Sequence, residues 1–305
     1  MTLAIIQVFV IQVILPVAFI LSLWKTKYPT RLDWIIQLLF TVVFITWLFL
    51  SGRWDWVGIY LKFVWVLLLI PAIYLSWKNT KSLPFRTKLN RSQKFSRGFN
   101  IVLLLIFGLY TTSSVSGYST EDEPIELAFP LKDGSYYIAH GGSATQINYH
   151  NAYEPQQYAL DIVKLNQFRT RANGIYPKDL DKYEIFGDIV YSACSGSVVE
   201  TRNNSPDLIP PESNPDQPEG NYVAIACDGT DAILYIVHLL EGSITVEAGE
   251  QLTVGNPIGQ IGNSGNTSEP HLHIHAEKDR IGVPLQFDEE FLVRNDVVKK
   301  ERVNK

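Results

Sequence analysis

The chain has 305 residues and a net charge of −5, but the charge is divided unevenly along its length. Residues 1–97 carry 12 Lys and Arg against 2 Asp and Glu, a net of +10, whereas residues 98–305 carry 14 against 29, a net of −15. This division predicts a basic, apolar membrane segment followed by an acidic, water-soluble domain. The acidity of the second part excludes nucleic acid as an expected partner.

Four apolar runs in the first 115 residues are the first predicted elements. Each has about the 20 residues that a helix needs to cross a bilayer, and Trp side chains lie near several run ends, as they do at membrane interfaces. We therefore expect residues 1–117 to form a bundle of four transmembrane helices, with the lipid bilayer as a partner. The runs are Leu3–Trp24, Trp34–Ser51, Trp56–Trp77 and Gly98–Val115.

Positive charge in the connections between these runs predicts their orientation. The first connection carries Lys25, Lys27 and Arg31, and the third carries seven Lys and Arg over residues 78–97 without an acid. The second carries only Arg53, beside Asp55. Because basic loops stay in the cytoplasm, we expect a multi-pass protein of the cytoplasmic (inner) membrane whose C-terminal domain is extracytoplasmic. With one helix more or fewer, the C-terminal domain would lie on the cytoplasmic side instead.

Short β-rich runs separated by turn residues follow a linker at residues 118–127. They predict a mainly antiparallel all-β domain over residues 128–293, with a charged tail at residues 294–305. The Pro- and Asn-rich stretch 203–220 is expected to be a long surface loop, either the wall of a cleft or a mobile insertion. The predicted strands are Ser135–Ala139, Tyr158–Lys164, Asp188–Ala193, Ser197–Arg202, Tyr222–Ala226, Ala232–His238, Pro257–Gly262 and His271–Glu277.

Two cysteines, Cys194 and Cys227, lie near the ends of two predicted strands. Their spacing does not resemble a zinc-knuckle pair. They either form a disulfide, which an oxidising exterior would permit, or remain two unpaired core residues. The sequence leaves both alternatives open because a disulfide requires a specific geometry.

All six histidines fall between His140 and His275, and three of them alternate along the run His271-Leu-His273-Ile-His275. Residues two apart in a strand point to the same face, so these three would line one side of one strand. Imidazole is a common metal ligand and a common acid or base near neutral pH. The pattern therefore indicates a metal or catalytic site, although a solvated strand is the simpler alternative.

Four motifs follow one another in this part: Leu234-Tyr-Ile-Val-His238-Leu, Gly249-Glu-Gln-Leu-Thr-Val-Gly255, Ile258-Gly-Gln-Ile-Gly262-Asn-Ser-Gly265 and Pro270-His-Leu-His273. This ordered set resembles the lysostaphin-type zinc metallopeptidases, also called LytM-like or murein endopeptidases. The resemblance covers roughly residues 134–277 and implies a lysostaphin-like fold of the barrel-sandwich, duplicated hybrid motif type. It also implies one bound Zn²⁺ and a substrate in peptidoglycan peptides.

Four residues receive roles from this resemblance. It implies that His273 and Asp161, the latter in Tyr158-Ala-Leu-Asp161, are metal ligands. It implies that His271 and His238 are catalytic residues that act on the substrate and the developing oxyanion. Two His and one Asp would give the three protein ligands of a catalytic zinc site, with one position left open.

The third ligand departs from the family pattern. The family usually has a His four residues before the Asp, but here that position is Gln157. The nearest upstream histidine is His150, in Asn148-Tyr-His150, which we assign as the third metal ligand across a loop insertion. His140 is the alternative.

Two functions remain in competition at this point. The first is a membrane-anchored zinc metalloendopeptidase that hydrolyses peptidoglycan cross-links or stem peptides, or another extracytoplasmic peptide. The second is a catalytically inert domain of the same fold that binds cell wall or regulates a partner hydrolase, a reading that Gln157 favours. A membrane sensor is weaker, since the basic connection at residues 78–97 is too short for a signalling domain.

Overall fold

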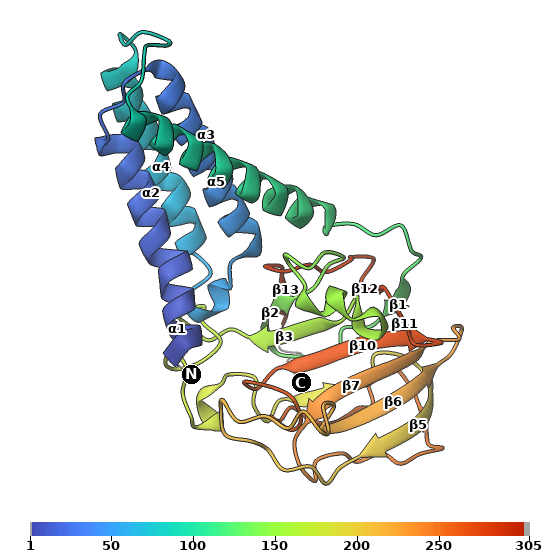
Figure 1. Ribbon diagram of the computed structural model, residues 1–305. Helices are drawn as coiled ribbons and strands as arrows, with labels where there is room; N and C mark the ends of the chain where they lie inside the picture. Colours follow the sequence, from blue (N-terminus) through green and yellow to red (C-terminus); the bar gives the residue numbers. More distant parts are fainter. Residues whose placement is uncertain (1, 302–305) are drawn as a thin grey trace. The chain divides into compact units, whose positions relative to one another are not determined.

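The structure, a computed structural model, describes residues 2–301 and divides into two compact units (Figure 1). The helical unit comprises Thr2–Trp54 and Ile59–Val115. The β unit comprises the residues from Ser116 onward together with the short segment Asp55–Gly58. A segment that lies between two helices in the sequence is therefore part of the β unit.

Four helices of the helical unit are long and apolar enough to cross a membrane, as the sequence predicts. The first is interrupted by a π-helical turn and has Pro16 where its last part begins. Thr30 caps the second by accepting a hydrogen bond from the Asp33 amide. The elements are α1 (Thr2–Phe9), η1 (Val10–Ile14), α2 (Leu15–Lys25), α3 (Arg31–Ser51), α4 (Leu61–Thr80) and α5 (Arg91–Ser116).

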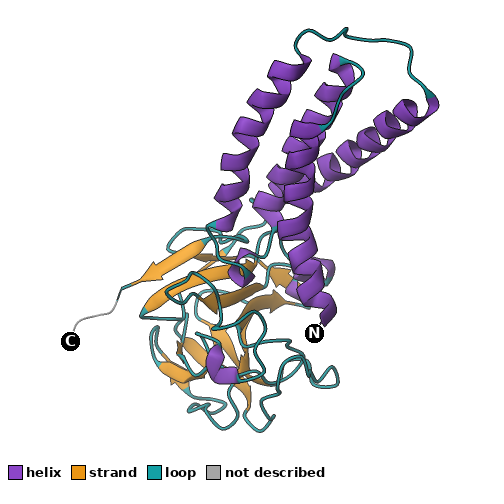
Figure 2. Cartoon of the chain, turned by 90° about the vertical axis from the view of Figure 1, so that its left-hand side faces the viewer, coloured by secondary structure: helices purple, strands orange, loops and turns teal. Residues whose placement is uncertain are grey.

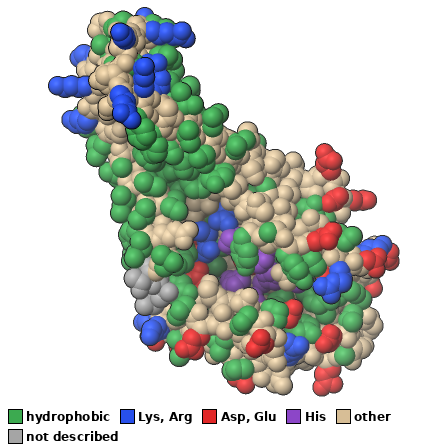
Figure 3. All heavy atoms as spheres, viewed as in Figure 1, with side chains coloured by type: hydrophobic (Ala, Val, Ile, Leu, Met, Phe, Trp, Pro, Cys, Tyr) green, Lys and Arg blue, Asp and Glu red, His purple; other side chains and the backbone are tan. Residues whose placement is uncertain are grey.

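Polar side chains join neighbouring helices within this unit. Arg97 of α5 bonds Asp33 of α3 at 2.7 Å, and Asn100 donates to Gln37 at 2.8 Å. Such pairs satisfy groups that would be costly to expose to hydrocarbon. Figure 3 shows a cluster of Lys and Arg side chains at the end of the unit where the connections α2–α3 and α4–α5 lie.

The β unit is built on one large antiparallel sheet with strand order β13-β2-β3-β10-β7-β6-β5-β8, and β11 also pairs with β10. Figure 2 shows the strands confined to this unit, with loops covering much of its surface. The mainly antiparallel β domain predicted from the sequence is confirmed. The strands of this sheet are β2 (Gly134–His140), β3 (Leu160–Lys164), β5 (Gly196–Arg202), β6 (Asn221–Cys227), β7 (Ile233–Leu239), β8 (Gln251–Leu252), β10 (Leu272–Lys278), β11 (Ile281–Val283) and β13 (Val297–Lys300).

Two smaller sheets and several short helices complete the β unit. β1 pairs in parallel with β12, and β4 pairs antiparallel with β9. Cys194 and Cys227 form a disulfide with their Cα atoms 5.7 Å apart, which settles the alternative left open by the sequence. The remaining elements are β1 (Ile125–Leu127), β4 (Ile189–Tyr191), β9 (Pro257–Gln260), β12 (Leu285–Phe287), η3 (Tyr149–Ala152), η4 (Glu154–Gln156), η5 (Leu180–Lys182) and η2 (Trp54–Trp56), whose first residue belongs to the helical unit.

The charged tail predicted at residues 294–305 contains a strand. Val297–Lys300 form β13, which pairs with β2 and covers an edge of the large sheet. Val298 packs against the hydrophobic core, and an edge strand tolerates Lys on its exposed positions. The basic residues of this segment concealed its strand character in the sequence.

Strand β10 has one apolar face and one face that carries histidines. Its residues Leu272, Ile274 and Ala276 belong to the main hydrophobic core. The intervening His273 and His275 point to the other face, because side chains alternate along a strand. The expected alternation of the histidine run is thus explained by the core on its opposite side.

Candidate metal centre

Asp161 and His273 face each other across two neighbouring strands. β3 and β10 pair antiparallel, with Asp161 directly opposite His273. Directly opposed residues have neighbouring side chains on the same face, and here His273 Nδ1 lies 2.9 Å from Asp161 Oδ1. Both side chains are buried. The register of the sheet therefore positions two of the expected metal ligands.

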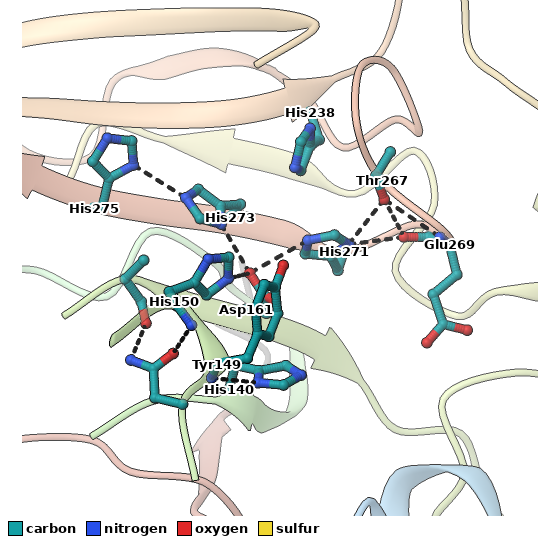
Figure 4. Close-up of polar contacts among 12 residues, drawn as sticks. His140, Tyr149, His150, Asp161, His238, Thr267, Glu269, His271, His273 and His275 are labelled. Atoms are coloured by element: carbon teal, nitrogen blue, oxygen red, sulfur yellow. Dashed lines mark hydrogen bonds and ion pairs between the residues drawn. The ribbon is translucent and has the colours of Figure 1, made fainter. Parts of the chain in front are cut away.

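His150 reaches the same carboxylate from an irregular segment. Its Nε2 atom lies 3.0 Å from Asp161 Oδ1, and its side chain is buried (Figure 4). The segment turns through η3, where Asn148 Oδ1 accepts a hydrogen bond from the His150 amide. Asn148 is fully buried, and its Nδ2 donates to the carbonyls of Gly142 and Ala159. Asn148 therefore fixes the turn that carries His150.

The donor atoms of His150, Asp161 and His273 all lie within 4.8 Å of one another. Zinc bonds to His nitrogen and carboxylate oxygen are about 2.0–2.2 Å long, so two ligands of a tetrahedral ion lie about 3.3 Å apart. The separations of 3.0 and 2.9 Å from Asp161 are close to that value. These three side chains therefore have the chemistry and the spacing to hold a metal ion.

His140, the alternative third ligand, lies elsewhere. Its Nδ1 is 2.6 Å from Nη2 of the buried Arg294, and its ring centroid is 6.0 Å from that of His150. Among residues 2–301, two groups of side chains could hold a metal, and His140 belongs to neither. Gln157, at the usual family position, instead directs its Nε2 to the Gly282 carbonyl at 3.3 Å.

His238 and His271 lie beside the three donors and form the second group with His273. The Nδ1 atom of His271 is 2.8 Å from the Glu269 carbonyl oxygen, and that of His238 is 2.9 Å from the Ser264 carbonyl oxygen. A carbonyl only accepts, so each Nδ1 carries a proton. Nε2 of His271 lies 3.4 Å from Asp161 Oδ1. The two rings are 5.0 Å apart, in an edge-to-face arrangement.

The backbone of His238 adopts a left-handed conformation, with φ of +63°. A residue other than glycine is uncommon there, and such outliers concentrate at functional sites. His238 lies near the end of β7, and its amide bonds to the Glu219 carbonyl rather than continuing the regular ladder. This departure from strand geometry turns the imidazole beside His271.

His275 contacts a proposed ligand rather than standing apart on the surface. It is buried, its Nδ1 lies 3.1 Å from His273 Nε2, and its ring stacks on Tyr235 at 4.9 Å. An acceptor at this position holds the proton of His273 on Nε2 and leaves Nδ1 for a metal. The sequence placed His275 on the correct face but did not reveal this contact.

Burial and neighbouring charges control protonation in the cluster. Burial, reinforced by His150, lowers the pKa of His273 to about 4. Burial likewise holds the pKa of His238 well below 6.5. Burial opposes ionisation of Asp161, but His150 and His271 outweigh it and hold its pKa well below 3.8. His273 and Asp161 are therefore in the deprotonated forms that bind metal near neutral pH.

A groove passes over these side chains. Figure 3 shows the histidines gathered in a hollow on one face of the β unit. The segment that carries His150 lines one side, and the loop predicted at residues 203–220 contributes another side, so that loop forms part of a cleft wall. The residues lining the groove around His150, His238 and His273 include Tyr149, Tyr153, Gln156, Pro218, Glu219 and Asn266.

Two glycines, Gly220 and Gly265, allow the groove wall to pass close to the backbone beside His238. A Cβ on Gly220 would lie 2.3 Å from the Ser264 carbonyl carbon, and one on Gly265 would lie 2.4 Å from the Gly220 nitrogen. Both residues also have positive φ, +61° and +89°. Only glycine permits this close backbone approach, which supports the Ser264 carbonyl that His238 contacts.

Two buried groups near the centre lack a signal in the sequence. Asn is a common turn residue, so Asn148 does not stand out in the sequence. Only its burial and its hydrogen bond to the His150 amide show that it orients His150. Arg171 and Glu269 form a buried ion pair at 2.6 Å, although 98 residues separate them. A lone Glu two residues before His271 could have drawn attention, but its partner could not have been identified.

Residues 181–284 match the family model described as Peptidase family M23. No match was found among curated proteins. Among solved structures, a zinc-containing peptidase from Vibrio cholerae is 25% identical with a TM-score of 0.26, and the alignment covers 33% of this chain and 26% of that one. The chain thus spans about a quarter of that relative.

Two further structures align over a larger share of both chains at lower identity. The catalytic domain of lysostaphin from Staphylococcus simulans is 16% identical with a TM-score of 0.26, covering 49% of this chain and 77% of that one. An M23 peptidase from Pseudomonas aeruginosa is 16% identical with a TM-score of 0.28, covering 59% and 57%. Because these TM-scores are low, the similarity to a known family rests on the family-model match alone. Residues 181–284 of this chain are thus similar to peptidase family M23.

Proposed function

We propose that the chain is a membrane-anchored zinc metalloendopeptidase that hydrolyses peptide bonds in peptidoglycan cross-links or stem peptides. The observation that carries this proposal is the convergence of His150, Asp161 and His273, with two further imidazoles beside them. The match of residues 181–284 to a peptidase family supports the reaction class. The substrate class follows from the resemblance to the lysostaphin-type enzymes.

The donor set suits zinc because imidazole nitrogen and carboxylate oxygen are among its usual ligands. When bound, zinc supplies Lewis-acid chemistry, since it polarises a carbonyl and eases deprotonation of water. His150, Asp161 and His273 would hold the ion. Their burial and mutual hydrogen bonds would keep the three donor atoms in place for the ion.

His271 and His238 would act directly on the substrate. Each imidazole donates its Nδ1 proton to a backbone carbonyl, which fixes the ring, and Nε2 of His271 lies 3.4 Å from Asp161 Oδ1, beside the proposed metal ligands. A protonated Nε2 can donate to the oxyanion that develops on the scissile carbonyl, and a neutral Nε2 can accept a proton from attacking water. Two fixed imidazoles side by side allow both tasks in one site.

The proposed location is the cytoplasmic membrane, with the β unit outside. The Lys- and Arg-rich connections α2–α3 and α4–α5 favour the cytoplasmic side, and an even number of spans then brings the β unit to the exterior. The disulfide between Cys194 and Cys227 supports this orientation, because disulfides persist in oxidising compartments.

The test uses the full chain purified in detergent and supplied with zinc. We expect one tightly bound zinc ion per chain and the release of new amino groups from purified peptidoglycan. His273→Ala should lose both the metal and the hydrolysis, while His140→Ala keeps the metal. A folded, zinc-supplied wild-type chain without bound metal contradicts the proposal.

The inert-domain alternative has one observation in its favour, the replacement of the usual ligand position by Gln157. This alternative predicts a different result in the same experiment. A chain of that kind binds peptidoglycan in a sedimentation assay but releases no amino groups, with or without zinc.

A further inference from the structure

A buried arginine lies below the loop that carries His271. Arg171 is 1% exposed, and its Nε and Nη2 donate to Oε2 of Glu269 at 2.8 and 2.6 Å. Glu269 is itself buried. An ion pair at this depth needs good geometry and further polar partners to offset its desolvation. Nη2 also donates to the Ile175 carbonyl at 3.2 Å, and further contacts to Arg171 come from a distant part of the sequence.

The segment Asp55–Gly58, which follows helix α3 and belongs to the β unit, covers Arg171. The Asp55 carboxylate is completely buried, and its Oδ2 lies 3.7 Å from Arg171 Nε. The Asp55 carbonyl accepts a hydrogen bond from the Arg171 amide at 3.0 Å. The guanidinium lies 3.9 Å from the centroid of the Trp56 ring, a favourable cation–π arrangement.

Trp56 and Tyr176 extend this contact toward the same loop. Their rings stack with centroids 5.3 Å apart, and the Tyr176 hydroxyl donates to the Ser268 carbonyl at 2.6 Å. The segment Asp55–Gly58 is therefore linked to the loop before β10 through two sets of intervening residues. One set is Arg171 and Glu269, and the other is Tyr176 and Ser268.

The loop in turn determines the orientation of His271. The Glu269 carbonyl lies 2.8 Å from His271 Nδ1, and the Thr267 hydroxyl donates to the same carbonyl at 2.8 Å (Figure 4). Glu269 thus binds Arg171 with its side chain and His271 with its backbone. Movement of the Glu269 side chain would displace the carbonyl that fixes the imidazole.

We propose that Asp55, Arg171 and Glu269 are positioning residues for His271, so the connection between α3 and α4 is a working part of the peptidase site. This inference rests on the proposed function for its catalytic consequence. It assigns to the membrane hairpin a task beyond anchoring, since a single helix would anchor the β unit without supplying Asp55 and Trp56. Loss of the Asp55 charge leaves Arg171 with one carboxylate and loosens the loop before β10.

The test compares Asp55→Asn with Asp231→Asn in the zinc-loaded full chain. Asp231 is a matched control because it pairs with Lys278 at 2.9 Å but is 82% exposed, on the surface. Changes in residues that orient groups around a metal site typically cost 10–100-fold. We therefore expect Asp55→Asn to lower kcat by about tenfold or more while KM and zinc content stay near wild type. Amide hydrogen exchange over residues 267–272 should accelerate in Asp55→Asn alone.

Equal kcat and equal exchange in the two variants would overturn the proposal. If Asp55→Asn does not fold, Glu269→Gln decides, because it removes the charge that Arg171 binds and keeps the backbone carbonyl. That variant must show the same kcat loss and the same faster exchange, or the proposal fails. If even the wild type hydrolyses no peptidoglycan, the proposed function fails, and the exchange comparison alone still decides whether Asp55 positions the loop.

Discussion

The proposed metal centre is assembled from two regions of contrasting regularity. β10 contributes His273 by strand register, opposite Asp161 of β3. The segment between β2 and β3 contributes His150 through a bulge and two short 3-10 helices. In the first region the hydrophobic core dictates where the side chain points. In the second region, hydrogen bonds of individual residues such as Asn148 do so, and the contrast predicts different sensitivities to mutation.

The strand region should show the largest effect. We expect His273→Ala in the full chain to lose stoichiometric zinc and to lower peptidoglycan hydrolysis by about 10³-fold or more, because metal catalysis supplies several kcal/mol. Metal analysis and amine release measure the two effects. A variant that keeps both would remove His273 from the centre.

The irregular region is tested by a matched pair of histidines. His150→Ala should lose zinc as His273→Ala does, because His150 Nε2 lies 3.0 Å from Asp161. His140→Ala should retain zinc, since His140 contacts Arg294 instead. Metal content of the two purified variants is the measurement, and the opposite result would transfer the third ligand to His140.

Asn148 tests how much the irregular region depends on one side chain. Asn148→Ala removes the acceptor for the His150 amide and the donor to Gly142 and Ala159. We expect zinc affinity to fall by about 10–100-fold, as for other groups that orient a ligand. Competition with a chelator measures the affinity. An unchanged affinity would show that the backbone holds His150 without this side chain.

His275 is the equivalent test on the strand region, with a smaller expected effect. His275→Leu removes the partner of His273 Nε2, but the pairing of β10 with β3 and β7 still holds His273 in place. Zinc affinity should therefore fall by no more than about tenfold, at the low end for such changes. A loss larger than that of Asn148→Ala would reverse the proposed ranking of the two regions.

The smallest effect concerns the zinc-free protein as pH falls. His238, His273 and His275 have pKa values lowered by burial, so below about 6.5 the unfolded chain binds protons that the folded chain does not. His271, with a raised pKa, opposes this trend, as do Asp188 and Glu277, whose carboxyl pKa values are raised by burial. Stability should decrease from pH 6.5 toward 4, as measured by thermal unfolding. Constant stability over that range would contradict the buried, neutral state of these histidines.

The sequence predicted the parts of the fold that repeat regularly. Apolar run length identified the four helices, and alternation along His271–Glu277 identified β10. It could not reveal that β13 completes the sheet, because Lys299 and Lys300 mask a strand whose identity depends on its partner. Nor could it pair Arg171 with Glu269 or Asp55, since long-range contacts leave no local pattern.

The motif resemblance supplied what periodicity could not. Alternation alone treats His271, His273 and His275 alike, whereas the structure gives each a different partner: Glu269, Asp161 and His273, respectively. Such distinctions arise from neighbours on other strands and loops. The roles assigned to these residues remain predictions that the variants above test.

The close approach of Gly220 and Gly265 constrains any redesign of substrate preference. Exchanging residues 203–220 for the corresponding loop of a relative is an obvious way to alter which peptides enter the groove. A graft with any side chain at position 220 would collide with the backbone at Ser264 and displace the carbonyl beside His238. Functional chimaeras must therefore keep both glycines or transplant the two loops as one cassette.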